Sequence, residues 1–212
     1  MLALAAVAGT ALHAAGLVGR VEGDTYVSPT GAFKIRIPVL AGLGGGIVDT
    51  PSLVTFQDEV STHISIVAIP QDATERWEMD TRGTKDYLIY FFKTYAFADF
   101  QRTYKDAKIE SALFIPGYMG GAMIAYVLLP GGSMFADHYP SIATDAKPPV
   151  AKRGNLIFVK NGFVFVVSTE LAERVIEGSA YSMTTDDENV LLRERLTDIV
   201  ARMQFLPQPG EN

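Results

Sequence analysis

The chain contains no cysteine and has three histidines among its 212 residues. Without cysteine, disulfide bonds, thiolate zinc sites, iron–sulfur clusters and cysteine nucleophiles are all excluded. Histidine, the usual general base and metal ligand, offers few candidates. No run of Lys and Arg is longer than the pair at 152–153, and the formal net charge is −6. Nucleic-acid binding needs a basic stripe that displaces counterions from phosphates, so the sequence argues against that class of function.

The motifs of common catalytic and cofactor sites are also missing from the sequence. No G-x-S-x-G turn marks a serine nucleophile, and no H-E-x-x-H pattern marks a zinc site. The glycine-rich stretches at 42–47 and 117–122 lack the G-K-[ST] ending of a phosphate-binding loop. The sequence therefore indicates no cofactor. It favours a protein that is not an enzyme, although that question stays open.

The opening stretch carries no charged side chain before Arg20. A secretory signal has a short apolar core followed by small residues, and Ala14 or Ala15 fits the position before the cut. A membrane-spanning helix needs about 20 strongly apolar residues, whereas this stretch is mostly Ala and Gly. A cleaved signal is the expected role, with an uncleaved anchor and an ordered helix as alternatives. The chain is then divided into a leader or anchor at 1–19, one domain at 20–206 and a polar tail at 207–212.

Hydrophobic residues make up 48% of the chain and charged residues 20%, which is enough apolar material for a core. Alternating apolar residues and turn signals predict strands, and the clearest is a hairpin around Asn161-Gly162, a pair that readily forms a type I′ turn. The predicted strand regions are 21–38, 53–59, 62–70, 107–116, 120–130 and 155–168, with a loop at 40–52.

Three helices are predicted between and after these strands. The main helix covers 84–100, where Gly and Pro are absent, and a short helix covers 170–177. The last helix begins with a capping box at 185–188 and carries one apolar stripe, formed by Leu192, Leu196, Ile199, Val200 and Met203. Antiparallel strands with helices packed on them predict an α+β fold, an α/β/α sandwich with flanking helices.

Three segments resemble the PsbP/Mog1 family. "YVSPTGAFKIRIP" at 26–38 is similar to the opening hairpin of that group. "RGNLIFVKNGFVFVVS" at 153–168 and "RLTDIVARMQF" at 195–205 are similar to its late hairpin and final helix. The resemblance implies a non-catalytic accessory or binding role, commonly outside the cytoplasm in bacteria. It carries over no catalytic residues.

The histidines were the first candidates for a site. His63 alternates with Ile64 and Ile66, so it is expected to face solvent. His138, with Asp137 before it and Tyr139 after it, is the best candidate for a ligand or metal contact. A zinc site would need three or four ligands, so His138 by itself defines none.

Aromatic residues are concentrated in the predicted main helix. Helical spacing places Leu88, Phe91, Phe92 and Tyr95 on a core face. Tyr90, Phe97 and Phe100 fall near the opposite, charged side. If that side is exposed, these three residues form a surface of the kind that binds a protein partner. If strands and loops cover the helix on two sides, they belong to the core.

These observations predict an exported protein, periplasmic or extracellular, that acts through a protein partner or a small ligand and catalyses no reaction. One alternative is a hydrolase or metal-dependent enzyme centred on His138. Another is a subunit of a larger assembly, tethered to the membrane by 1–19 and facing the periplasm.

Overall fold

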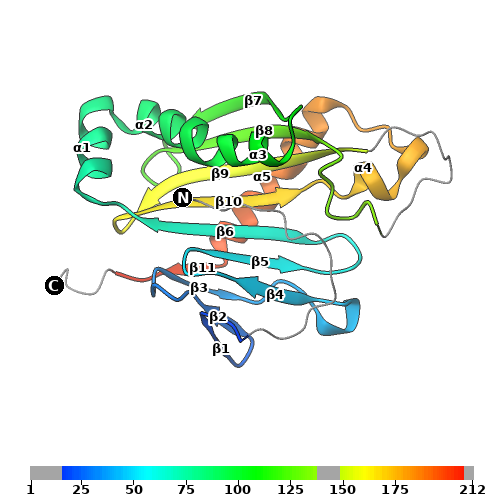
Figure 1. Cartoon of the computed structure of the whole chain (residues 1–212), viewed down its shortest axis with the longest axis horizontal. Coiled ribbons are helices and arrows are strands. Elements are labelled where there is room, and N and C mark those ends of the chain that lie inside the picture. The colour runs from blue at the N-terminus through cyan, green and yellow to red at the C-terminus, as the bar shows by residue number, and fades with distance from the viewer. Residues whose placement is uncertain (1–15, 138–148, 208–212) are drawn as a thin grey trace.

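A large antiparallel sheet forms the middle layer of the protein (Figure 1). The structure is a computed structural model, and it describes residues 16–137 and 149–207. Every pairing between the described strands of this sheet is antiparallel. Across the sheet the strands are β4 (Gly46–Asp49), β5 (Leu53–Gln57), β6 (His63–Pro70), β10 (Phe163–Glu170), β9 (Val150–Lys160), β8 (Ala122–Pro130) and β7 (Lys108–Ile115).

A second, smaller antiparallel sheet joins the two ends of the domain. Its strands, in order, are β1 (Arg20–Glu22), β2 (Thr25–Val27), β3 (Phe33–Arg36) and β11 (Met203–Phe205). Phe33 and Ile35 of β3 are buried while Arg36 is exposed, as the alternation in the sequence predicted. The pairing of β11 with β3 brings residues near the C-terminus against the opening hairpin.

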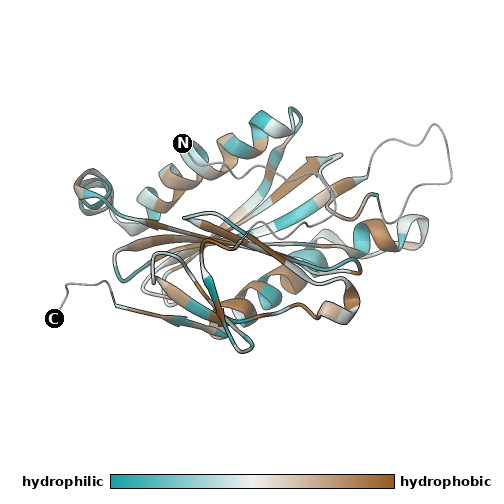
Figure 2. Ribbon diagram, turned by 60° about the horizontal axis from the view of Figure 1, so that its bottom comes forward, coloured by the Kyte–Doolittle hydropathy of each residue, from teal (hydrophilic) through white to brown (hydrophobic). Residues whose placement is uncertain are grey.

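Helices lie on both faces of the large sheet. On one face are α1 (Ala73–Arg82), α2 (Thr84–Phe91), a π-helical segment (Phe92–Phe97) and α3 (Ala98–Thr103). On the other face α5 (Thr185–Ala201) packs beside the small sheet, and the short α4 (Glu173–Ile176) follows β10. Figure 2 shows the sheet edge-on as a mainly hydrophobic layer with a helix on either side. The predicted α+β sandwich with flanking helices is therefore confirmed.

The two faces of the sheet hold separate apolar clusters. One lies under α2 and α3, and the other lies under α5 and the small sheet. Gly154 allows α5 to approach β9, because a Cβ atom there would stand 2.9 Å from Leu196 Cδ1 and 3.2 Å from Leu192 Cβ. The predicted stripe of α5 is buried here from Leu192 to Val200, and Met203 of β11 joins it.

The hairpin predicted around Asn161-Gly162 is confirmed, since these residues have φ of +48° and +70° and join two paired strands.

Several local predictions need correction. The expected loop at 40–52 contains a short 3-10 helix (Ala41–Leu43) and β4. The expected helix at 170–177 shortens to α4, because β10 continues through Glu170. Thr184, not Thr185, caps α5: its side chain accepts a hydrogen bond from the Asp187 N–H.

Candidate functional site

A groove opens where α5 and the small sheet diverge at one end of the large sheet. Its cavity has a volume of about 280 Å³. The floor consists of the ends of β6 and β10, one wall is α5, and the other is the end of β3 with the turn between β5 and β6. The lining residues are Ile35, Pro38, Ser61, Thr62, Ile64, Thr169, Arg195, Asp198, Ile199 and Arg202.

The α5 wall presents charged and apolar groups in one stripe. Arg195, Asp198, Ile199 and Arg202 are spaced i, i+3, i+4 and i+7, so they share one side of the helix. Two helical turns, about 10 Å, separate the two arginine positions along the axis. This wall therefore offers two guanidinium groups on either side of an aliphatic side chain.

Ion pairs hold both arginines in place. Arg195 Nη1 donates to Glu173 Oε2 of α4 at 3.2 Å, and Nη2 donates to Oε1 of the same carboxylate. Burial by itself would raise the pKa of Glu173, but the hydrogen bonds and charge of Arg195, together with a backbone hydrogen bond, hold that pKa below its ordinary value. Arg202 pairs with Asp198 at 2.5 Å, in a pair that is more than half exposed. The first arginine is thus fixed firmly, and the second weakly.

The opposite wall is a turn organised by one carboxylate. Asp58 Oδ1 accepts hydrogen bonds from the N–H groups of Val60, Ser61 and Thr62 at 2.8 to 3.0 Å. Burial tends to raise the pKa of Asp58, but these donors hold it below its ordinary value. Because the turn is fixed in this way, the hydroxyl-bearing residues Ser61 and Thr62 have defined positions at the groove.

Exposed aliphatic residues flank the groove. Leu40, two residues after Pro38, is 67% exposed. Leu43 and Val60 are also exposed, and the carbonyl oxygen of Leu43 accepts a hydrogen bond from the Glu59 N–H at 3.1 Å. This contact ties the segment at 40–45 to the turn that forms the groove wall. The groove therefore combines apolar side chains such as Ile64 and Ile199 with polar groups on both walls, as binding pockets do.

No motif in the sequence predicts this groove. Its residues come from four separate regions of the chain, so no local pattern contains them. One signal was present: Arg195 and Arg202 lie seven residues apart on the predicted last helix, next to the apolar stripe rather than opposite to it.

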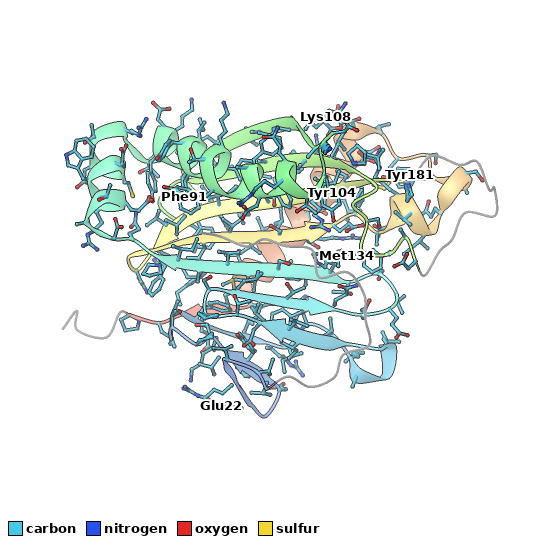
Figure 3. All side chains as sticks on the ribbon, viewed as in Figure 1. Glu22, Phe91, Tyr104, Lys108, Met134 and Tyr181 are labelled. Carbon is cyan, nitrogen blue, oxygen red and sulfur yellow. The ribbon has the colours of Figure 1, made fainter. Side chains whose placement is uncertain are left out.

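The structure describes only one of the three candidate ligand residues after β8. Asp137 is exposed, whereas His138 and Tyr139 lie outside the described residues. The segment that leads to Asp137 is firmly attached, because Ser133 Oγ and the Met134 N–H donate to the two oxygens of Glu170 at 2.6 and 3.1 Å. Figure 3 shows Met134 at this end of the large sheet.

The aromatic surface expected on the main helix is corrected in part. Phe100 is 2% exposed, so it belongs to the core and not to a surface. Tyr90 and Phe97 are half-buried and pack against the cluster under the helices. For Phe100 the physical reason is the π-helical segment at 92–97, which shifts the residues after it around the helix axis relative to regular spacing. Whether Tyr90 and Phe97 contact a partner stays a prediction.

The expectation for His63 was wrong: its side chain is 4% exposed. The alternation of side chains along β6 separates the two faces of this strand, but it does not show which face is exposed. In the structure both faces are covered. Its strand partner Gln57 donates to the carbonyl oxygen of Met134, which shows that the segment at 131–137 lies over this part of the sheet. Burial, with Arg153 as a second cause, lowers the pKa of His63 well below its ordinary value.

This burial predicts a pH dependence of stability. The unfolded chain binds a proton at His63 near pH 6.5, whereas the folded protein does so only at lower pH. Stability should therefore be full above about pH 6.5 and fall below it, by at most about 1.4 kcal/mol per pH unit. Urea unfolding between pH 7 and 5 measures this slope, and His63→Gln should flatten it. Parallel curves for the two proteins would contradict the expectation.

Two general features of the described residues bear on function. Within 16–137 and 149–207, no three His, Asp or Glu side chains lie together in a way that could hold a metal ion. In the same residues, no helix is both long and apolar enough to cross a bilayer.

Comparisons with known proteins were made for the sequence and for the fold. No protein-family model matches the sequence, and no curated protein matches it. Among solved structures, one from Bacteroides thetaiotaomicron is similar over 89% of this chain, with 10% identity and a TM-score of 0.46. The chain spans 50% of the length of that protein.

A second similar structure is the Saccharomyces cerevisiae Ran-binding protein Mog1p. It matches 91% of this chain and 97% of its own length, with 8% identity and a TM-score of 0.45. At these identities and scores the likeness concerns the arrangement of strands and helices and carries no conclusion about function.

Proposed function

We propose that the protein is an exported, non-catalytic accessory protein that binds a partner or small ligand in the groove beside α5. The observation that carries this proposal is the construction of the groove. Its floor contains Ile64 and Thr169, and both walls are fixed by hydrogen bonds to carboxylates, which Asp58 accepts on one side and Glu173 on the other. A recognition site needs such pre-positioned polar groups around an apolar surface.

Export is the second part of the proposal, and it rests on the uncharged opening stretch of the sequence. The contacts of the domain with its N-terminal end support it. The N–H groups of Val18 and Gly19 donate to the two oxygens of Asp49 at 2.9 and 2.7 Å. A cut after Ala14 or Ala15 would leave these contacts intact.

The experiment is recovery of the tagged full-length protein from its native envelope fraction, followed by identification of bound proteins and the intact mass of the chain. We expect a chain shortened by the leader and a partner that is lost with Arg202→Glu. Arg193→Glu is the matched control, because it makes the same charge change on an exposed residue of α5 outside the groove.

Each part of the proposal has its own contradicting result. A full-length mass in the membrane fraction would show an uncleaved anchor and overturn processing of the leader. A partner retained equally by Arg202→Glu and Arg193→Glu would show that binding takes place away from the groove.

A further inference from the structure

The charges and the size of the groove restrict its ligand. We propose that it binds a small amphiphilic carboxylate, an apolar group that ends in one –COO⁻. This inference rests on the proposed function, because it specifies the ligand class of the same groove.

The cavity volume sets an upper limit on ligand size. About 280 Å³ lies just below the about 300–1,000 Å³ of pockets that enclose drug-sized ligands. A dinucleotide, a haem or a folded partner domain would not fit inside. A short aliphatic chain or one apolar amino-acid side chain would fit, with Ile64 and Ile199 as its surroundings.

The charged residues of the lining itself favour an anionic ligand. Two arginines and one aspartate line the groove, so the lining has one excess positive charge. Glu173 lies behind this lining and accepts from Arg195. A guanidinium has five N–H donors and a carboxylate oxygen pair usually engages two of them, so Arg195 retains capacity for a further acceptor.

Arg202 is the more accessible of the two arginines. Its side chain is 59% exposed, and its partner Asp198 is 58% exposed. Exposed ion pairs of this kind contribute about 0.2–1 kcal/mol. A ligand carboxylate could therefore replace Asp198 on Arg202 at little cost, while Ser61 and Thr62 line the other wall. Asp198 acts as an internal competitor for the ligand.

The same chemistry occurs in a free fatty acid and in the apolar C-terminal residue of a peptide. Two probes distinguish these sources: octanoate for the first and N-acetyl-leucine for the second. Octanol and octylamine keep the chain of octanoate but remove or reverse its charge. The full-length protein is titrated with each probe, and binding is followed by NMR shifts of the Thr62, Ile64 and Thr169 amides.

We expect a carboxylate probe to bind at least tenfold more tightly than octanol or octylamine. Arg202→Glu should weaken that binding about tenfold, and Asp198→Asn should strengthen it severalfold by removing the competitor. Arg193→Glu should leave it unchanged. Whichever of octanoate and N-acetyl-leucine binds more tightly identifies the source of the natural carboxylate.

Equal binding of octanoate, octanol and octylamine would overturn the charge requirement. Absence of amide shifts with both carboxylates would overturn the ligand class. If the envelope partner is nevertheless lost with Arg202→Glu, the proposed function stands and only this inference falls. If that partner is also insensitive to Arg202→Glu, both fall.

Discussion

Lys152→Ala is expected to lower the free energy of unfolding by about 3–5 kcal/mol, the range measured when one partner of a buried ion pair is removed. The Lys152 ammonium is fully buried between the carboxylates of Glu110 and Glu188, with its Nζ 2.9 Å from Glu188 Oε2. It also lies 5.5 Å from the centre of the Tyr126 ring. Without the lysine, two carboxylates would stay in a site that has lost its main positive charge.

The chain brings these groups together in a specific way. β7 has an irregular register between Ile109 and Ser111, a β-bulge that contains Glu110. Bulges change the direction of a side chain, and here that carboxylate reaches Lys152 on β9. Glu188 comes from the first turn of α5 and also accepts from the Tyr181 hydroxyl at 2.6 Å. The ion cluster therefore holds the start of α5.

Equilibrium unfolding in urea followed by circular dichroism measures the effect. Lys160→Ala is the matched control, since Lys160 is an exposed residue at the end of the same strand. The control should change stability by less than about 0.5 kcal/mol. A loss below about 1 kcal/mol for Lys152→Ala would mean that the cluster contributes little to folding.

Phe165→Ala is expected to cost a similar amount, about 3–5 kcal/mol. The Phe165 ring is fully buried and stacks on Phe158 with the ring centres 5.2 Å apart. Its neighbours in the small sheet are Phe205 at 5.1 Å and Phe33 at 6.1 Å, both in edge-on geometry. One side chain of the large sheet thus contacts the paired strands β3 and β11 of the small sheet, and its removal leaves a cavity between the two sheets.

Trp77→Ala provides the control for Phe165→Ala. Trp77 is the single tryptophan of the chain and is 61% exposed on α1, so its removal deletes a large aromatic group without opening a cavity. The same urea experiment compares the two variants. If Phe165→Ala and Trp77→Ala lower the free energy of unfolding equally, the packing of Phe165 between the two sheets does not contribute specifically to stability.

Local patterns determined the elements whose signals are themselves local. Asn161-Gly162 adopts positive φ at both residues, so this pair specified the hairpin of β9 and β10 without help from the rest of the chain. The apolar stripe from Leu192 to Val200 specified the buried side of α5 in the same manner. Strand alternation and helix periodicity together were sufficient for the α+β class.

Tertiary structure decided which faces are covered and which distant residues meet. A period of two separates the two faces of β6, but burial of the His63 side depends on residues far away in the sequence, such as Arg153 and the segment at 131–137. In the sequence Lys152 is one residue of a short basic pair, with no sign that it is buried. In the structure it lies in the interior between two glutamates. The groove required β3, the β5–β6 turn, β10 and α5 to converge. Such convergence depends on packing over long sequence separations, which no local pattern encodes.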